Sequence, residues 1–411
     1  MSQTIEWDPE IDAPATIAVI GCGPVALEAA LYARFLGYGV FVYEQGRIAS
    51  KLSKTPERLM GRGTDHTSGE LCSSLGLAAL DAQESPCNLD DTRDVSSQEY
   101  LEHYLLPLAR TDLLRDSIGV QSKVCSISRT CSDASLDQDL TTKSELEFRV
   151  LISSRKRGEY VQIADIILDC SGLATQQGLA SGGGLAVGEQ DLLPNENGYW
   201  PEFGETCQNS LSPTDHVMIW GDNQAACSAV LQLAAMIEKE QIEKVTWIRP
   251  KRLSNSKLKF RGVPEAEREA CEQLAAELQP KLVQLDAWGI ESLKLVDTSW
   301  KVVCQTTDEE TLDLHCTAFI NFSDQQRDWS FWPGTPPKPV DYEDSSESAP
   351  ENVPKNALRS VFTTEPHYYL LGEKSQRNLS LHQAREQIKN LFSIIGGRRE
   401  LDLYSSIQPK S

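Results

Sequence analysis

The chain has 411 residues, which is long enough for about two or three domains with ample apolar core. Its 60 acidic and 39 basic residues leave a formal charge of -21, which argues against nucleic acid and anionic membrane surfaces as partners. The acidic N-terminal segment, MSQTIEWDPEIDAPA, lacks the basic and apolar regions of a secretory signal, so we expect a reducing, cytoplasmic location.

The 11 cysteines and 6 histidines are scattered along the chain, and no cysteine pair has C-x-x-C spacing. Cys170 and Cys227 lie in apolar runs, where a small buried thiol is the simplest interpretation. The sequence therefore predicts no structural zinc site and no disulfide framework.

The clearest pattern begins at residues 16–20, a short apolar run whose β-branched residues suit a strand buried on both faces. A G-x-G-x-x-A turn follows and leads into a helical pattern that ends at Gly37. Its glycines allow a sharp turn, its proline suits a first helical position, and its alanine lets the helix pack on the strand: Gly21, Gly23, Pro24 and Ala26.

A second apolar run, at residues 40–43, ends at Glu44. This arrangement directs backbone N–H groups and the positive end of a helix at a pyrophosphate, and it places an acid where a ribose can donate hydrogen bonds. A tight βα turn in another doubly wound fold is the alternative. A membrane span over residues 19–43 is a second alternative, which Glu28, Arg34 and the glycines argue against.

The segment at residues 45–97 is polar and gives few periodic signals. It either passes over a bound flavin and its substrate or forms an ordinary surface excursion. Apolar residues at helical spacing then predict a helix over residues 97–108, with Ser97 as its cap.

Strand-like runs separated by polar turns predict a β-meander over residues 123–129, 145–153 and 159–163. The next run, ADIILDCSG at residues 164–172, is an apolar strand that ends in small residues. Ser171 and Gly172 would let a ligand or another backbone approach the carboxyl end of this strand, where open α/β sheets bind ligands.

The same order of elements repeats in the second half of the chain. A strand pattern at residues 216–220 is followed by a glycine turn, a helical pattern and another strand pattern at residues 244–248. Residues 318–321 repeat the closing strand. This duplication implies two bound nucleotides, or one dinucleotide cofactor facing another.

The second turn keeps Gly221 and Ala226 but has Asn223 in place of the middle glycine. Asparagine tolerates positive φ better than other non-glycine residues, so the turn can survive. The strand after its helix ends in basic residues rather than an acid, which suits a 2′-phosphate and favours NADPH: Arg249, Lys251 and Arg252. The alternative is that these are solvated loop charges.

Residues 324–356 are rich in proline, serine and acids, which is typical of a mobile linker or surface loop. An apolar run at residues 367–371, a turn at Gly372 and a helix over residues 381–395 would then complete the first sheet. The N-terminus of that helix would favour a developing negative charge. His382, near its start, is the candidate general acid or base, with a surface histidine as the alternative.

These patterns together resemble the two-dinucleotide-binding-domain flavoproteins, the group that contains thioredoxin-reductase-like enzymes and flavin-containing monooxygenases. The motifs that carry the resemblance are VIGCGPVALEAALYARFLGYGVFVYE, ADIILDCSG, VMIWGDNQAA with WIRPKR, and YYLLGEKSQRN. It implies an α/β fold with two Rossmann-like domains, each with a β-meander, the second inserted into the first. The FAD-binding domain, NAD(P)-binding domain, acidic linker and final FAD-binding part would span residues 1–210, 211–325, 326–356 and 357–411.

The resemblance also implies cofactor contacts. Val124 would contact adenine through its backbone, and Gly372 with Glu373 would hold the ribitol chain, with glutamate replacing the usual aspartate. The full set implied for FAD is Gly21, Gly23, Pro24, Ala26, Glu44, Val124, Gly172, Gly372 and Glu373. The set implied for NADP is Gly221, Asn223, Ala226, Arg249 and Arg252.

Several departures from the group bear on the reaction. No C-x-x-C dithiol is present, which argues against the thioredoxin-reductase reaction. The monooxygenase signature of a glycine-flanked Phe followed by His is missing at Phe203, and the closing segment of the second domain reads NFSD without a glycine.

We therefore expect an FAD-dependent oxidoreductase that takes a hydride from NAD(P)H and passes electrons to a small molecule, a redox partner protein or O₂. Hydroxylation of an amine or another small substrate fits this class. The alternative from another class is a non-catalytic relative that keeps FAD or a nucleotide for a structural or sensing role. A component of an electron-transfer complex is a third possibility.

Overall fold

The computed structural model describes residues 7–53, 59–60, 71–85, 87, 89, 95–131, 140–176, 178–192, 196–201, 203–251, 265–306, 310–323, 325–340, 358, 360–376, 379–398 and 400–407. The chain forms two compact units. Unit 1 comprises Met1–Ala174 and Arg327–Ser411, and unit 2 comprises Thr175–Gln326. The second unit is therefore inserted into the first, as the sequence predicts.

Unit 1 is built on a five-stranded sheet in the order β21-β9-β1-β2-β5, with every neighbouring pair parallel. The strands are β1 (Thr16–Ile20), β2 (Gly39–Tyr43), β5 (Ile118–Gly119), β9 (Ile166–Asp169) and β21 (Tyr368–Leu370). The chain moves outward from β1 in one direction to β2 and in the other to β9. In open parallel sheets, ligands bind at the carboxyl ends of the strands beside such a reversal.

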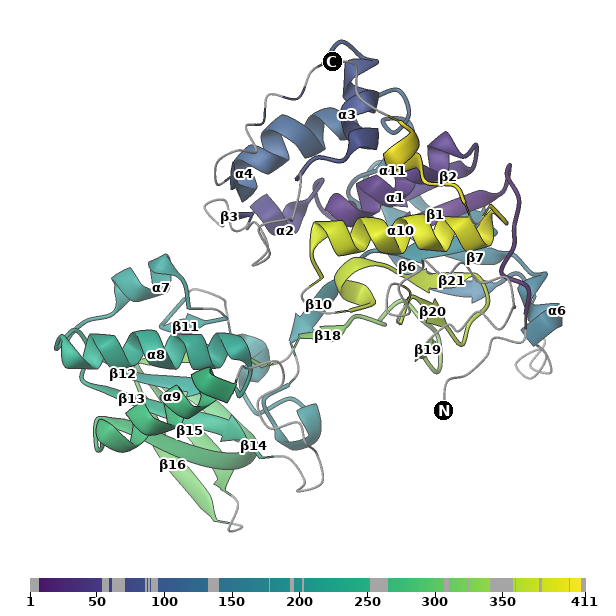
Figure 1. Cartoon of the computed structure of the whole chain (residues 1–411). Coiled ribbons are helices and arrows are strands. Elements are labelled where there is room, and N and C mark those ends of the chain that lie inside the picture. Colours follow the sequence, from purple (N-terminus) through teal and green to yellow (C-terminus); the bar gives the residue numbers. More distant parts are fainter. Residues whose placement is uncertain are drawn as a thin grey trace. The chain divides into compact units, whose positions relative to one another are not determined.

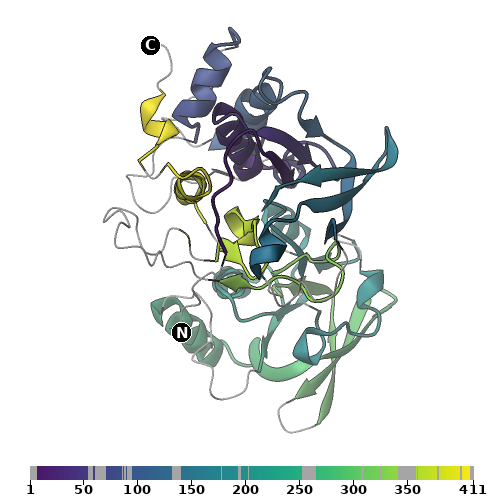
Figure 2. The same ribbon diagram turned by 90° about the vertical axis from the view of Figure 1, so that its right-hand side faces the viewer.

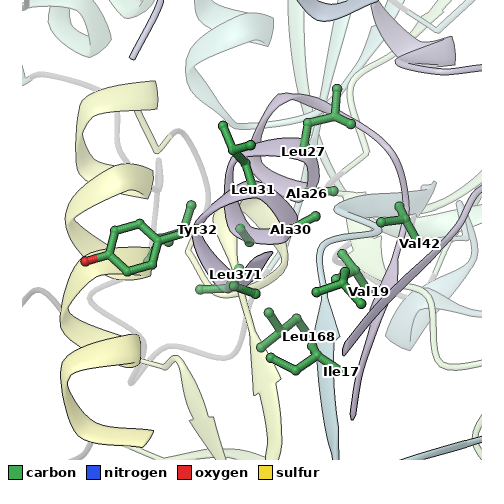
Figure 3. Packing of buried hydrophobic residues seen from close by; sticks show 14 of the residues in the cluster. Ile17, Val19, Ala26, Leu27, Ala30, Leu31, Tyr32, Val42, Leu168 and Leu371 are labelled. Carbon is green, nitrogen blue, oxygen red and sulfur yellow. The ribbon is translucent and has the colours of Figure 1, made fainter. Parts of the chain in front are cut away.

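Two long helices, α1 (Pro24–Phe35) and α10 (Leu381–Ile395), lie side by side over this sheet (Figure 1). Seen from the side, α10 is viewed almost down its axis (Figure 2). Figure 3 shows the inner face of α1 packed on Val19 and Leu168 of the strands, with the Tyr32 ring directed at α10. Tyr32 stacks on Phe392 of α10 with their ring centroids 5.2 Å apart. A continuous apolar core therefore fixes both helices on the strands.

The predicted meander is present as β6 (Ser122–Arg129), β7 (Phe148–Ser154) and β8 (Gly158–Ala164), paired antiparallel. Buried residues of β6 and β7 pack with Ile20 and Ile167 of the parallel sheet. The shorter elements of unit 1 are α2 (Ser50–Ser53), β3 (Leu59–Met60), α3 (Ser74–Asp81), β4 (Val95–Ser96), α6 (Leu140–Ser144), β19 (Pro339–Val340), β20 (Phe362–Thr363), η5 (Gly372–Lys374) and α11 (Leu403–Ser406).

The helix predicted over residues 97–108 is a continuous run of α4 (Ser97–Tyr100), η1 (Leu101–Leu105) and α5 (Leu106–Ala109). Its cap is Ser96 instead of Ser97. The Ser96 hydroxyl accepts the Glu99 N–H, and the Glu99 carboxylate accepts the Ser96 N–H, which forms a capping box.

Unit 2 repeats the parallel plan in a seven-stranded sheet, β11-β17-β12-β13-β14-β15-β16. Its strands are β11 (Tyr199–Trp200), β12 (His216–Trp220), β13 (Lys244–Pro250), β14 (Leu282–Val296), β15 (Ser299–Thr306), β16 (Thr311–Cys316) and β17 (Ala318–Asn321). The pairs from β11 to β14 are parallel, and β14-β15-β16 form an antiparallel meander. The helices are α7 (Glu205–Ser210), α8 (Gln224–Glu238) and α9 (Glu265–Glu277), with short 3-10 turns η3 (Ser181–Gly183) and η4 (Glu189–Asp191).

The first division between the units falls after Ala174, whereas the sequence places it after residue 210. The reason is that β11 pairs with β17 of unit 2. The units are connected by β10 (Leu173–Gln176) and β18 (Gln325–Arg327), which form a two-stranded sheet.

The segment predicted as a linker over residues 326–356 begins as an ordered part of unit 1. Trp329 and Trp332 pack their rings against Tyr368, and the Phe331 carbonyl accepts the Ile127 N–H at 2.9 Å. Phe331 is buried in the cluster that contains Ile20 and Ile167 of the parallel sheet, and Trp329 and Trp332 pack against that cluster. Residues 341–357 lie outside the described residues. Among the helices in the described part of the chain, none has both the length and the apolar character needed to cross a membrane.

Candidate functional site

The first glycine turn connects β1 to α1 in unit 1. Gly21 has a φ of +93°, and a Cβ there would lie 2.9 Å from the Cys170 carbonyl oxygen. Its N–H donates to the Tyr43 carbonyl at 2.7 Å. A larger residue would therefore be strained and would also collide with the end of β9, so glycine is required at this position.

The N-terminus of α1 is left open by the residues around it. Gly23 is the N-cap and provides no side-chain hydrogen bond, and Pro24 occupies a first-turn position. A Cβ on Gly23 would meet no atom within 4 Å, so space is present beside the turn. Ala26 is fully buried and allows the helix to lie close to the strands. An N-terminus without a side-chain cap, next to small residues, fits a bound phosphate group.

Glu44 follows β2 and lies at the same edge of the sheet. Its Oε2 accepts the Cys22 N–H at 3.0 Å, and its Oε1 accepts the Gly46 N–H at 2.8 Å. Each carboxylate oxygen has a further lone pair, so the group can also accept a ribose hydroxyl. Burial and the Glu44 charge raise the pKa of the Cys22 thiol to about 12, which keeps this cysteine protonated.

A lysine and a glutamate come together around Gly172. A Cβ on Gly172 would lie 2.9 Å from the Lys51 Nζ and 3.7 Å from the Glu373 Oε2. The Lys51 ammonium donates to the Leu173 carbonyl at 2.6 Å. The structure therefore brings the predicted residues Gly172 and Glu373 together. It also places the ammonium group of Lys51 beside them, which no motif in the sequence indicates.

Gly372 is held against both long helices. It has a φ of +62°, and a Cβ there would lie 3.1 Å from the Val25 side chain at the start of α1. Its N–H donates to the Gln387 Oε1 of α10 at 3.2 Å, and its carbonyl accepts the Ser375 hydroxyl at 2.7 Å. These contacts position Glu373, the next residue, beside the first glycine turn.

A buried ion pair lies directly behind this edge. Lys374 and Asp169 have fully buried side chains, with Nζ and Oδ2 3.3 Å apart. Tyr368 donates to the same Asp169 oxygen at 2.7 Å, and the Ser171 hydroxyl donates to the other oxygen at 2.6 Å. The Lys374 ammonium also donates to the Asp328 carbonyl at 2.6 Å. Both charges are therefore compensated and hydrogen-bonded, as buried charges must be.

The remaining unit 1 residues of the prediction lie apart from these contacts. Val124 is buried in β6, beside a bulge in its pairing with β7. His382 is an exposed residue in the first turn of α10.

The second glycine turn, in unit 2, has a cap that the first one lacks. Asn223 is the N-cap of α8, and its Oδ1 accepts the Ala226 N–H at 3.0 Å. Its Nδ2 donates to the Phe322 carbonyl at 2.8 Å. Gly221 has a positive φ, and a Cβ there would lie 2.8 Å from the Phe322 Cβ. The turn survives without its middle glycine because Asn223 has an extended backbone, with φ of -90°.

A cavity of ≈ 250 Å³ opens beside this second turn. Its lining includes Gly221 and Asp222 from the turn and Trp288 from β14. The Lys251 ammonium, also at its wall, lies 4.8 Å from the centroid of the Trp288 ring. The cavity thus combines an aromatic surface, a cation and a glycine turn, which suits a nucleotide.

Arg249 is held by acids at the end of β13. Its Nε lies 2.8 Å from the Asp286 Oδ1, and its Nη1 lies 3.4 Å from the Glu272 Oε1. A guanidinium in these two ion pairs is directed at carboxylates of its own unit. Arg252, the other arginine predicted for NADP, lies outside the described residues.

No sequence-family model matches the chain, and no curated protein matches it in sequence. Solved structures match it over nearly its full length. The bacillithiol disulfide reductase Bdr (YpdA) from Bacillus cereus is 14% identical with a TM-score of 0.55, covering 93% of this chain and 99% of that one. The same enzyme from Staphylococcus aureus is 13% identical with a TM-score of 0.50, covering 94% and 98%. Thioredoxin reductase from T. acidophilum is 15% identical with a TM-score of 0.50, covering 93% and 98%.

These similarities define the fold. The chain has the two-unit α/β architecture of these reductases, as its motifs predict.

Proposed function

We propose that unit 1 binds FAD and that the chain is an FAD-dependent oxidoreductase supplied with electrons by NAD(P)H. The observation that carries the proposal is the open N-terminus of α1 at Gly23, flanked by the close approach of Gly21 to β9. Glu44 and Glu373 lie at the same edge of the sheet. This set of groups matches a dinucleotide with an anionic centre and hydroxyls on either side.

The chain's own residues would bind and orient the cofactor. The α1 N-terminus would hold the pyrophosphate, and Glu44 would accept hydrogen bonds from the adenosine ribose. Glu373 would accept from the ribitol hydroxyls, and Lys51 would place a positive charge near the same region. Lys374 and Asp169 would keep the backbone under Glu373 and Gly172 fixed. When bound, FAD supplies a ring system that accepts a hydride and passes electrons on.

Unit 2 would bind NADPH in the cavity beside Gly221. Lys251 is the basic residue at the cavity wall, so we assign the 2′-phosphate to it in preference to Arg249. Trp288 would provide an apolar surface for an aromatic base. The electron acceptor would be a small molecule or a redox partner protein in the cytoplasm.

The reaction would be of the reductase type or of the monooxygenase type. The disulfide reductases among the similar structures support the first, and the absence of a C-x-x-C pair in this sequence means that the dithiol of thioredoxin reductases is not its route.

A non-catalytic nucleotide-binding role is the second candidate, and one observation favours it. Asn223 fills the capping position of α8 that a nucleotide phosphate would use, while Arg249 is held by Asp286 and Glu272. In that case unit 1 keeps its FAD, and unit 2 does not deliver electrons.

The visible absorption spectrum of the purified protein, before and after anaerobic NADPH, tests both candidates. A flavin band that NADPH bleaches supports the oxidoreductase. A flavin band that NADPH leaves unchanged supports the non-catalytic role. A protein that takes up no flavin after incubation with FAD contradicts the proposal for unit 1. A comparison of NADH with NADPH, made in the unaltered protein and in a Lys251→Ala variant, tests whether Lys251 binds the 2′-phosphate.

A further inference from the structure

Two cysteines at either end of α3 bring their sulfur atoms into contact. Cys72 precedes Ser73, the N-cap of α3, and Cys87 follows the helix. Their Sγ atoms are 3.8 Å apart, and neither cysteine forms a disulfide. In the sequence these cysteines are 15 residues apart, so the spacing alone does not indicate a pair.

The two sulfur atoms are in van der Waals contact, which is the arrangement that precedes a covalent bond. A disulfide joins sulfurs about 2.05 Å apart and needs Cβ atoms roughly 3.5–4.5 Å apart. From the observed 3.8 Å, the two sulfur atoms must approach each other by about 1.8 Å to form the bond. The pair therefore has the proximity that thiol–disulfide exchange requires.

The two thiols differ in their access to solvent. Cys72 is 5% exposed, whereas Cys87 is partly exposed and directs its Sγ at the His103 carbonyl, 3.5 Å away. The contact with Cys87 and burial raise the pKa of the Cys72 thiol. Cys87 is thus the thiol that an external reagent can reach, and Cys72 is the one that can act only after it.

The backbone around Cys72 is fixed from several sides. The Leu71 carbonyl accepts the Tyr100 hydroxyl at 3.1 Å, and the Ser73 N–H donates to the Tyr104 hydroxyl at 3.1 Å. Tyr104 in turn donates to the buried Glu28 of α1 at 2.8 Å. The backbone on both sides of Cys72 is therefore held in place, with the Cys87 sulfur beside it.

We propose that Cys72 and Cys87 form a reversible dithiol–disulfide pair that reacts with low-molecular-weight disulfides such as oxidised glutathione. The Cys87 thiolate attacks one sulfur of the disulfide, forms a mixed disulfide and releases one thiolate. The Cys72 thiol then loses its proton and attacks the Cys87 sulfur, which releases the second thiolate. The chain's two thiols are oxidised to one disulfide, and the small disulfide is reduced to two thiols. This exchange needs neither FAD nor NADPH.

The test uses the full-length protein with its cofactor and no NADPH. The protein is incubated with oxidised glutathione, remaining thiols are blocked with N-ethylmaleimide, and unreduced digests are analysed by mass spectrometry. We expect a peptide that joins Cys72 to Cys87 and disappears when reduced glutathione is in excess. Cys131, which is exposed, reports that the reagent works. Glutathione on Cys131 with both Cys72 and Cys87 carrying maleimide would overturn the proposal.

Variants separate the two steps. In Cys72→Ser the second attack cannot occur, so we expect about tenfold more glutathione on Cys87 than in the unaltered protein. In Cys87→Ser we expect Cys72 to stay unmodified, because it is buried. Cys131→Ser is the matched control and keeps the Cys72–Cys87 link. A glutathione adduct on Cys87 that is equally abundant with and without Cys72 contradicts the pairing. The variants add to the result on the unaltered protein, which does not depend on their folding.

Discussion

The two glycine turns of the molecule share one backbone plan and differ in how their helices begin. Gly21 and Gly221 each have positive φ and each lie against the residue that follows a neighbouring strand. The N-terminus of α1 has no side-chain cap, whereas Asn223 caps α8. The comparison teaches that close packing of the turn on a neighbouring strand does not depend on how the helix begins, because unit 2 keeps this packing although its helix has a side-chain cap.

The ends of strands β9 and β17 also correspond to each other in the two units. After β9, the Ser171 N–H and hydroxyl donate to Asp169, and after β17 the Ser323 N–H and hydroxyl donate to Asn321 in the same way. A tyrosine contacts each residue. Asp169 in unit 1 is charged and pairs with Lys374, whereas Asn321 in unit 2 is neutral. The charged pair belongs to the unit where we place FAD.

Loss of the Lys374 charge is expected to have the largest effect on the free energy of unfolding. In Lys374→Met the Asp169 carboxylate stays buried without a cation, which lowers the free energy of unfolding by about 3–5 kcal/mol. Urea unfolding followed by tryptophan fluorescence measures the loss. The double variant Lys374→Met, Asp169→Asn copies the neutral arrangement of unit 2 and is expected to recover most of it. Equal stability of the single variant and the unaltered protein would show that the charge pair is not required.

Acid is expected to destabilise both units through one histidine in each, the buried His367 in unit 1 and the half-buried His216 in unit 2. Burial and Arg129 lower the pKa of His367 in unit 1 to about 4, and burial and Lys244 lower the pKa of His216 in unit 2 to about 4. An unfolded histidine has a pKa of about 6.5, so below that pH the unfolded state binds more protons. The contribution of each neutral histidine to the free energy of unfolding is therefore complete above about pH 6.5 and is lost as the pH falls toward 4. For His367 this loss is at most about 3 kcal/mol.

Urea unfolding at intervals between neutral pH and the onset of acid denaturation measures this loss. In His367→Asn, which tolerates the positive φ of this residue, the unit 1 transition should depend less on pH. An unchanged pH dependence would refute the assignment to His367.

The next effect concerns FAD retention. Gly21→Ala introduces a Cβ 2.9 Å from the Cys170 carbonyl at positive φ, so we expect strain of about 1–3 kcal/mol and roughly a tenfold loss of FAD affinity. Gly221→Ala causes the corresponding strain in unit 2 and should leave FAD affinity unchanged. Gly158→Ala, at positive φ but with no atom within 4 Å, controls for backbone strain alone. Fluorescence titration of FAD into the three proteins measures the difference; equal losses in all would contradict the site.

The smallest effect concerns the cap on α8. Asn223→Ala removes the acceptor for the Ala226 N–H and lowers the stability of unit 2 by about 1 kcal/mol. Asn223→Gly copies Gly23 of the first turn and should cost only a few tenths of a kcal/mol. If the cap blocks a phosphate, the glycine variant binds NADPH more tightly than the unaltered protein in a calorimetric titration. Unchanged or weaker NADPH binding by Asn223→Gly would show that the cap does not block a phosphate.

The sequence predicts the parallel sheets and both glycine turns because these depend on local signals. Apolar runs such as residues 16–20 and glycines such as Gly21 act within a few residues of themselves. The inserted arrangement was implied by the resemblance to the two-dinucleotide-binding-domain flavoproteins and by the strand, turn and helix predicted after residue 366. The sequence also predicts that Gly21, Gly172 and Gly372 lie near one another, and the structure places all three at one sheet edge.

What the sequence could not show depends on contacts between distant residues. Lys374 follows Gly372 and Glu373 with no motif to indicate that it pairs with Asp169. The acids that hold Arg249 come from α9 and β14. The aromatic residues after Arg327 looked like part of a linker because proline and acids dominate the composition of the residues that follow them.

The pairing of β10 with β18 has a consequence for how this chain is assembled. Unit 2 leaves unit 1 along one of these strands and returns along its neighbour. An insert whose two ends are adjacent can be gained, exchanged or shortened without moving the ends of its host, as with domains inserted into surface loops. Unit 2 is thus an inserted domain, and strands β9 and β21 of unit 1, which lie before and after it in the sequence, pair directly with each other.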